Sequence, residues 1–212
     1  MKRYCIQDIR PKQIKSIPWG WKNKDGWVVK PRGEIVMPHL IDYFDWKVFE
    51  VNSLKHLQYE KPITGTTAMK SVFTTACRFL GMQEAMIQLH TGELTKGLVQ
   101  ISNEMLIWNE RLIKYVKLDI AIQGDEIGTT RGMMISPELY RQYLKPIHKQ
   151  FAELFNNAGI ESWYHSDGDI SAVLADLKAI GFIGIYYQDI GNMKTELIKS
   201  DLKGIEVIRR NK

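Results

Sequence analysis

Four polar segments of the sequence carry side chains that can bind metals, anchor substrates or move protons, and each directly follows an apolar segment. They are residues 65–67 (GTT), 124–132 (GDEIGTTRG), 165–169 (HSDGD) and 188–192 (QDIGN). If they converge, their carboxylates, imidazole and guanidinium would shift one another's pKa values and suit substrate anchoring or proton transfer. The same residue types are common in turns and helix caps, so ordinary polar loops remain the alternative interpretation.

A metal site is suggested by the spacing of His165 and Asp167. Residues i and i+2 of an extended chain point to the same side, so these two side chains can share one ion. A third ligand would have to come from Asp125, Glu126, Asp189 or a residue of another chain. The alternative is a structural His165 that is hydrogen-bonded to a neighbouring carboxylate. The other histidines are predicted to be surface or hydrogen-bonded residues without a ligand role: His39, His56, His90 and His148.

We assign roles to these side chains on the expectation that they lie around one opening at the same end of the fold. Asp125 and Glu126 are expected to be polar or acid–base groups, and Arg131 is expected to be an anchor or an ion-pair partner. We expect His165 to face Asp125 across this opening. Four further residues are expected to contact substrate: Thr66, Thr130, Tyr187 and Gln188.

The elements that would hold these residues alternate between strand and helix. Strands are predicted near residues 63–65, 118–123, 160–165, 181–187 and 204–208, and helices at 72–80, from about 93, and at 137–157, 170–180 and 193–200. Ser136 and Pro137 are a typical N-cap and first helical residue. Repeated strand–helix units indicate a parallel sheet, whose carboxyl-terminal strand ends share one rim. No glycine-rich phosphate motif follows a strand, so a TIM-type (β/α) barrel is favoured over a nucleotide-binding fold.

The first 60 residues differ in composition from the rest. They are rich in Trp, Pro and Lys, and residues 27–37 predict a hairpin with Pro-Arg-Gly as its turn. We therefore expect an irregular N-terminal segment over residues 1–60. Residues 61–212 are expected to form an incomplete barrel of about five parallel strands, since a full barrel usually needs about 250 residues.

Composition excludes several classes of protein. The 212 residues are 44% hydrophobic and 25% charged, which is typical of a globular chain. The net charge of +5 comes from dispersed basic residues, so we expect no nucleic-acid partner. No apolar run is long enough for a membrane span. The two cysteines, Cys5 and Cys77, are too few for a disulfide scaffold and favour a cytoplasmic location.

Three segments together resemble one protein family. Residues 124–146 (GDEIGTTRGMMISPELYRQYLKP) resemble the segment GDDLGTQRGPLISPELYRKYLKP, residues 164–170 resemble HSCGNI, and residues 182–188 resemble a strand that ends in Gln. These segments belong to the uroporphyrinogen decarboxylase superfamily, in its branch of corrinoid-dependent methyltransferases. The similarity runs from about residue 61 to residue 208.

This resemblance implies a TIM-type barrel and an enzyme that transfers a methyl group. The transfer would run between a small methylated substrate and cobalamin on a partner corrinoid protein. Zinc would be held at the position of His165 and Asp167 and would activate a thiol or act as a Lewis acid. The sequence departs from the family because Asp167 replaces a zinc-binding Cys and no Cys follows Cys77.

Two alternatives stay open. One is uroporphyrinogen decarboxylation in porphyrin biosynthesis, with Asp125 or Asp167 stabilising a protonated pyrrole. The decarboxylase's N-terminal RQAGR segment is absent, because Arg3, Arg10 and Arg32 stand in other contexts. The other is a truncated, non-catalytic relative that binds a partner, forms a homo-oligomer or is completed by a second chain, since an incomplete barrel has open strand edges.

Overall fold

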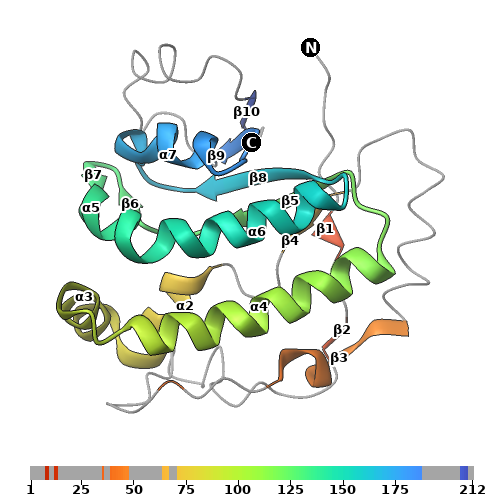
Figure 1. Cartoon of the computed structure of the whole chain (residues 1–212), viewed down its shortest axis with the longest axis horizontal. Coiled ribbons are helices and arrows are strands. Elements are labelled where there is room, and N and C mark those ends of the chain that lie inside the picture. The colour runs from red at the N-terminus through yellow and green to blue at the C-terminus, as the bar shows by residue number, and fades with distance from the viewer. Residues whose placement is uncertain are drawn as a thin grey trace. The chain divides into compact units, whose positions relative to one another are not determined.

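The computed structural model describes residues 8–9, 12–13, 35, 39–47, 64–66, 71–187 and 206–209. These residues fall into two compact units, residues 1–120 and residues 121–212 (Figure 1). The predicted hairpin at residues 27–37, apart from Ile35, and the predicted helix at 193–200 lie outside the described residues.

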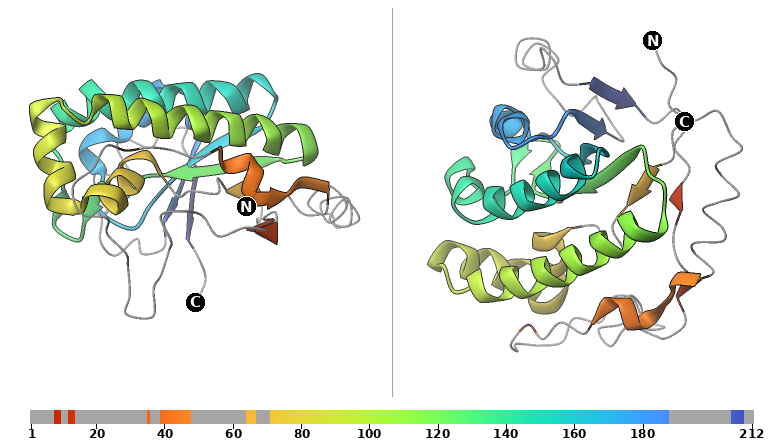
Figure 2. Two further views of the ribbon diagram at one scale, coloured as in Figure 1. Left: turned by 90° about the horizontal axis from the view of Figure 1, so that it is seen from below. Right: turned by 45° about the vertical axis from the view of Figure 1, so that its right-hand side comes forward.

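The first unit is mainly helical. Its elements are β1 (Asp8–Ile9), β2 (Lys12–Gln13), η1 (Leu40–Tyr43), β3 (Phe44–Asp45), β4 (Thr64–Thr66), α2 (Val72–Leu80), α3 (Met82–Thr91) and α4 (Thr95–Tyr115). β1 pairs in parallel with β4, and β2 pairs with β3 antiparallel. α2 packs on both α3 and α4 (Figure 2).

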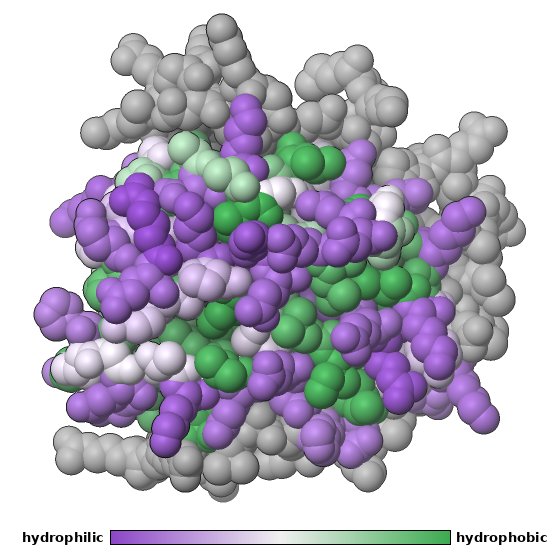
Figure 3. Space-filling view, in the orientation of Figure 1, coloured by the Kyte–Doolittle hydropathy of each residue, from purple (hydrophilic) through white to green (hydrophobic). Residues whose placement is uncertain are grey.

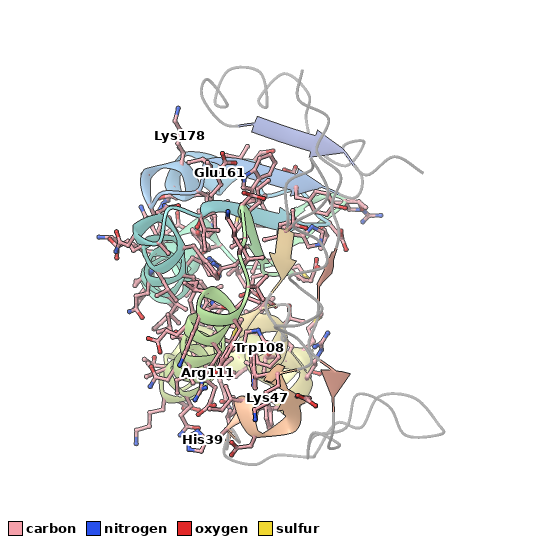
Figure 4. All side chains as sticks on the ribbon, turned by 90° about the vertical axis from the view of Figure 1, so that its right-hand side faces the viewer. His39, Lys47, Trp108, Arg111, Glu161 and Lys178 are labelled. Carbon is pink, nitrogen blue, oxygen red and sulfur yellow. The ribbon has the colours of Figure 1, made fainter. Side chains whose placement is uncertain are left out.

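An apolar stripe explains why α4 folds onto this unit. Residues three or four positions apart share one face of a helix. The buried residues of α4 follow that spacing: Leu98, Ile101, Met105, Trp108 and Leu112. The Trp108 ring lies 4.7 Å from the Trp46 ring in an edge-on arrangement. Figure 4 labels Trp108 on α4, the helix with which η1 is in contact.

The second unit is built from strand–helix repeats. Its elements are β5 (Ile120–Gly124), β6 (Gly128–Thr129), β7 (Gly132–Met133), α5 (Pro137–Leu139), η2 (Tyr140–Leu144), α6 (Lys145–Asn157), β8 (Glu161–Ser166), η3 (Ser171–Val173), α7 (Leu174–Ala179), β9 (Gly184–Tyr187) and β10 (Glu206–Arg209). Its four main strands neighbour one another in the order β5-β8-β9-β10. β8 pairs with β9, and β9 with β10, in parallel. This parallel sheet with its helices is consistent with part of a TIM-type barrel.

The helical segment from Pro137 to Asn157 covers the sheet with its apolar side. Ile147, Phe151 and Phe155 of α6 are buried, while the side of α6 seen in Figure 3 is mostly hydrophilic. The segment widens into a π-helical turn at η2. Pro146 lies just after this turn, and a proline has no N–H for the regular helical hydrogen bond. The wider turn therefore accommodates Pro146 without ending the helix.

Most elements expected from the sequence are present, with small shifts at their ends. The strands expected at 118–123, 160–165, 181–187 and 204–208 correspond to β5, β8, β9 and β10. The helix expected at 170–180 is split into η3 and α7. The elements that were not expected are β1, β2, η1 and β3 within residues 1–60, the helix α3, and the β6–β7 hairpin. No helix among the described residues is long and apolar enough to cross a membrane.

Candidate functional site

Glu126, His165 and Asp167 bring three metal-ligand atoms together at the ends of β5 and β8. All three atoms lie within 4.8 Å of one another. His165 Nε2 is 3.4 Å from Asp167 Oδ1 and 3.9 Å from Glu126 Oε1. The side chains of Asp167 and Glu126 are 44% and 31% exposed, whereas Asp167 Oδ1, which faces His165, is buried.

A main-chain contact orients the imidazole of His165. Its Nδ1 lies 2.9 Å from the carbonyl oxygen of Tyr186, the residue paired with His165 across β8 and β9. A carbonyl can only accept a hydrogen bond, so Nδ1 carries the hydrogen and donates it. Nε2 then presents its lone pair to the two carboxylates. Histidines that ligate metals are commonly oriented in this way.

Close main-chain packing between two glycines holds the two loops of the cluster together. A side chain on Gly128 would lie 2.8 Å from the Asp169 carbonyl oxygen, and one on Gly168 would lie against the Gly128 main chain. The Asp169 N–H also donates to the Thr129 carbonyl at 2.8 Å. These contacts join the β6–β7 hairpin to the loop after β8, and so they fix Glu126 relative to Asp167.

Asp125 points away from this cluster, toward the helix. It is 1% exposed, and its Oδ2 lies 3.4 Å from Nε2 of His148, which is 3% exposed. The expectation that His165 would face Asp125 is therefore corrected. His165 faces Glu126 and Asp167. Asp125 and Glu126 lie just after β5 in a tight turn, in which the Ile127 N–H donates to the Asp125 carbonyl at 2.9 Å. In this position Asp125 does not touch a substrate that reaches Glu126.

His148 was expected to be a surface or hydrogen-bonded residue, and its pairing with Asp125 was not foreseen. The sequence carried a signal, because His148 continues the apolar stripe of Leu144, Phe151 and Phe155. A histidine on such a stripe is buried with the stripe and needs a polar partner. The partner itself is 23 positions away in the sequence.

The remaining predicted residues are not brought into the cluster by any described contact. Thr130 and Arg131 are exposed at the turn between β6 and β7, where the Arg131 N–H donates to Thr129 Oγ1 at 3.1 Å. Thr66 ends β4 in the first unit and Tyr187 ends β9, and their side chains lie outside the described part. Gln188 and Asp189 lie outside the described residues altogether.

The ligand set of the cluster fits a divalent metal such as zinc. Zinc accepts imidazole nitrogen and carboxylate oxygen, and the ligand atoms of a tetrahedral zinc ion lie about 3.4 Å apart. The separation of His165 Nε2 and Asp167 Oδ1 is 3.4 Å. Two carboxylates close together repel each other unless a cation or a proton lies between them. The oxygen-rich set is harder than a thiolate set and suits a stronger Lewis acid.

Comparisons with known proteins find similarity at the level of solved structures. No protein-family model matches the chain, and no curated protein matches its sequence. Among solved structures, a methyltransferase from Methanosarcina mazei aligns with a TM-score of 0.59 and 20% identity, over 76% of this chain and 47% of that chain. The chain thus spans about half the length of that methyltransferase. At this identity the similarity demonstrates a shared fold.

Proposed function

We propose that this chain transfers a methyl group between a small methylated compound and the cobalamin of a corrinoid protein, as a member of the uroporphyrinogen decarboxylase superfamily. The observation that carries the proposal is the Glu126–His165–Asp167 cluster at the carboxyl ends of two neighbouring parallel strands. Reactive groups of β/α barrels lie at these strand ends. The fold shared with a methyltransferase and the similarity of residues 124–146 to the corrinoid-dependent branch support the same function.

A zinc ion held by Glu126, His165 and Asp167 would supply Lewis acidity at the heteroatom that bears the methyl group. The residues of the chain have separate tasks around it. His165, held by the Tyr186 carbonyl, keeps Nε2 directed at the two carboxylates. Glu126 and Asp167 are both partly exposed and are within reach of a bound substrate.

The transfer itself requires little acid–base chemistry from the protein. The bond between the methyl carbon and the donor heteroatom breaks as the bond to the acceptor forms, and the heteroatom keeps the bonding electron pair. The negative charge that develops on the heteroatom must be neutralised by a proton or a cation. A zinc ion held by the cluster would be that cation, so we assign to Glu126 the role of a metal ligand and not that of the proton donor.

Metal analysis and methyl transfer test the proposal together. The purified chain is loaded with Zn²⁺ or Co²⁺ and incubated with reduced cobalamin and a panel of methylated thioethers, amines and alcohols. Formation of methylcobalamin is followed by visible absorption. We expect His165→Ala to lose the metal and to lower the rate by at least about 100-fold, since loss of even an outer hydrogen-bond partner costs about 10–100-fold.

His90→Ala is the matched control, because His90 is an exposed histidine on α3. It should leave metal content and rate unchanged. A wild-type chain that binds neither Zn²⁺ nor Co²⁺, and accelerates no methyl transfer over free cobalamin, would contradict the proposal.

The decarboxylase alternative gains no support from the described geometry. It required Asp125 or Asp167 to contact a pyrrole ring. The Asp125 side chain is buried against His148, and only Asp167 is accessible. An assay for decarboxylation of uroporphyrinogen by the same preparation tests this alternative directly.

A further inference from the structure

A buried polar network lies behind the cluster, on the helix side of the sheet. Its members are Asp125, Tyr140, His148 and Tyr164, each at most 3% exposed. Asp125 directly precedes Glu126 in the sequence, and Tyr164 directly precedes His165. Tyr164 and His165 are consecutive residues of β8 and point to opposite sides of it, whereas Asp125 and Glu126 are consecutive residues of the turn after β5. Each of two cluster residues therefore shares a peptide unit with a member of the network.

We propose that this network positions Glu126 and His165 for the cation, with His148 as its central positioning residue. The proposal rests on the metal site of the proposed function. It adds residues on the helix side of the sheet that orient the ligands without touching the cation. His148 comes from α6, whereas the cluster comes from the ends of β5 and β8.

The contacts of His148 reach both strand ends. Its Nε2 lies 3.4 Å from Asp125 Oδ2, and its ring lies 5.3 Å from the ring of Tyr164 in an edge-on arrangement. Tyr164 Oη in turn donates to the Asp125 carbonyl at 3.5 Å. That carbonyl belongs to the peptide unit that leads to Glu126. Asp125 and Tyr164 are thus linked both directly and through His148.

Tyr140 fixes the hydrogen positions of the network. Its hydroxyl oxygen lies 3.4 Å from His148 Nδ1. Burial, with further contributions from Asp176 and Asp125, raises the pKa of Tyr140 well above its ordinary value. The hydroxyl therefore keeps its proton and can donate it to Nδ1 of a neutral imidazole. Nε2 of a neutral imidazole then carries the hydrogen, which points at the Asp125 carboxylate.

Loss of the imidazole would disturb the cluster through the main chain. A buried carboxylate that loses one of its hydrogen-bond partners is destabilised and shifts toward its remaining polar neighbours. Any movement of Asp125 changes the peptide unit shared with Glu126. A metal site tolerates ligand displacements of only about 0.2 Å. Metal affinity is therefore more sensitive to this network than the overall fold is.

The test compares Co²⁺ affinity with thermal stability in the full chain. His148→Phe keeps a ring but removes both nitrogens, and it should weaken Co²⁺ binding about 10–100-fold and alter the visible spectrum of the bound Co²⁺. His148→Gln restores an N–H donor toward Asp125 and should recover part of that affinity. Phe151→Leu, on the same buried stripe, is the control, because it destabilises the helix without touching the network.

The proposal is supported if Co²⁺ affinity falls in the His148 variant but not in Phe151→Leu, whatever their melting temperatures are. Equal Co²⁺ affinity in wild type, His148→Phe and Phe151→Leu overturns it, as does a loss of affinity in Phe151→Leu that matches the loss in His148→Phe. If His148→Phe does not fold, Tyr140→Phe and Asp125→Asn each change one polar group and replace it in the comparison.

A measurement without metal separates this proposal from the proposed function. In protein labelled with ¹⁵N-histidine, His148→Phe should shift the imidazole signals of His165, whereas His90→Ala should not. If the wild-type chain binds no Co²⁺ but the His165 signals still shift in His148→Phe, the metal site is contradicted and the positioning role of His148 is retained. If the wild-type chain binds Co²⁺ but the His165 signals do not shift in His148→Phe, the metal site is supported and the positioning role of His148 is contradicted.

Discussion

Replacing Gly168 by alanine should separate the two loops that carry the cluster. The added Cβ would meet the main chain of Gly128 and would lie 2.5 Å from the Thr129 nitrogen, whereas ordinary contact begins at 3.4 Å. The gap must therefore widen by at least 3.4 − 2.5 = 0.9 Å. The obstacle is main chain and not the flexible end of a side chain, so rotation of a side chain cannot relieve it.

Gly168→Ala is expected to lower both the stability of the protein and its affinity for Co²⁺. Overpacking of this kind typically destabilises a protein by about 1–3 kcal/mol. A separation of 0.9 Å between the loops of Glu126 and Asp167 also exceeds the roughly 0.2 Å tolerance of a metal site. We therefore expect Co²⁺ affinity to fall by about 100-fold or more, beyond what the lost stability alone would produce.

Isothermal titration with Co²⁺ and a thermal melt measure these two effects separately. Gly159→Ala is the control, because Gly159 has a φ of +74° and no atom within 4 Å of an added Cβ. That change should cost about 1–2 kcal/mol of backbone strain and leave Co²⁺ affinity unchanged. The reasoning is refuted if Gly168→Ala binds Co²⁺ as tightly as Gly159→Ala does.

Three further predictions concern the scaffold of the second unit. Gly184→Ala places a Cβ 2.5 Å from Cε3 of the buried Trp163 ring, so we expect a loss of about 1–3 kcal/mol in chemical denaturation; a wild-type midpoint would contradict this. Ser136 Oγ accepts the Leu139 N–H at 3.2 Å, so Ser136→Ala should cost about 1 kcal/mol, read from the same denaturation curves against Ser136→Asp, which retains the cap. Burial opposes ionisation of Asp176, but hydrogen bonds and charge from Arg141 and Lys145 outweigh it and lower the pKa of Asp176. A lowered folded-state pKa gives stability that is present above the unfolded-state pKa and is lost as the pH falls through the folded-state value. Asp176→Asn should therefore cost about 0.2–1 kcal/mol at neutral pH and nothing in strong acid, and an equal cost at both pH values would argue against the ion pairs.

Local pattern was sufficient to predict most elements of the fold. The alternation of short apolar strands with amphipathic segments predicted β5, β8, β9 and β10, and the helical segments that lie between β5 and β9. It failed for α3, where only Ala85 and Leu89 of ten residues are buried and the apolar stripe is too short to stand out. It also missed the β6–β7 hairpin, whose strands have two residues each.

The candidate site was partly predictable for the same reason. The pairing of His165 with Asp167 follows from the two-residue repeat of an extended chain, which the sequence contains. Glu126 was one of three possible third ligands. The choice between Asp125 and Glu126 depends on which side of β5 faces the helix, and that is decided by α6 packing against the sheet.

The sequence by itself determined which side chains stand at the strand ends and which of them share a strand face, because these properties repeat every two or four residues. Tertiary structure alone decided the partners. It brought His148 into contact with Asp125, 23 positions away in the sequence, and packed Gly168 against Gly128. Such contacts depend on how separate elements pack. The spacing of residues within one element does not indicate which other element it will contact.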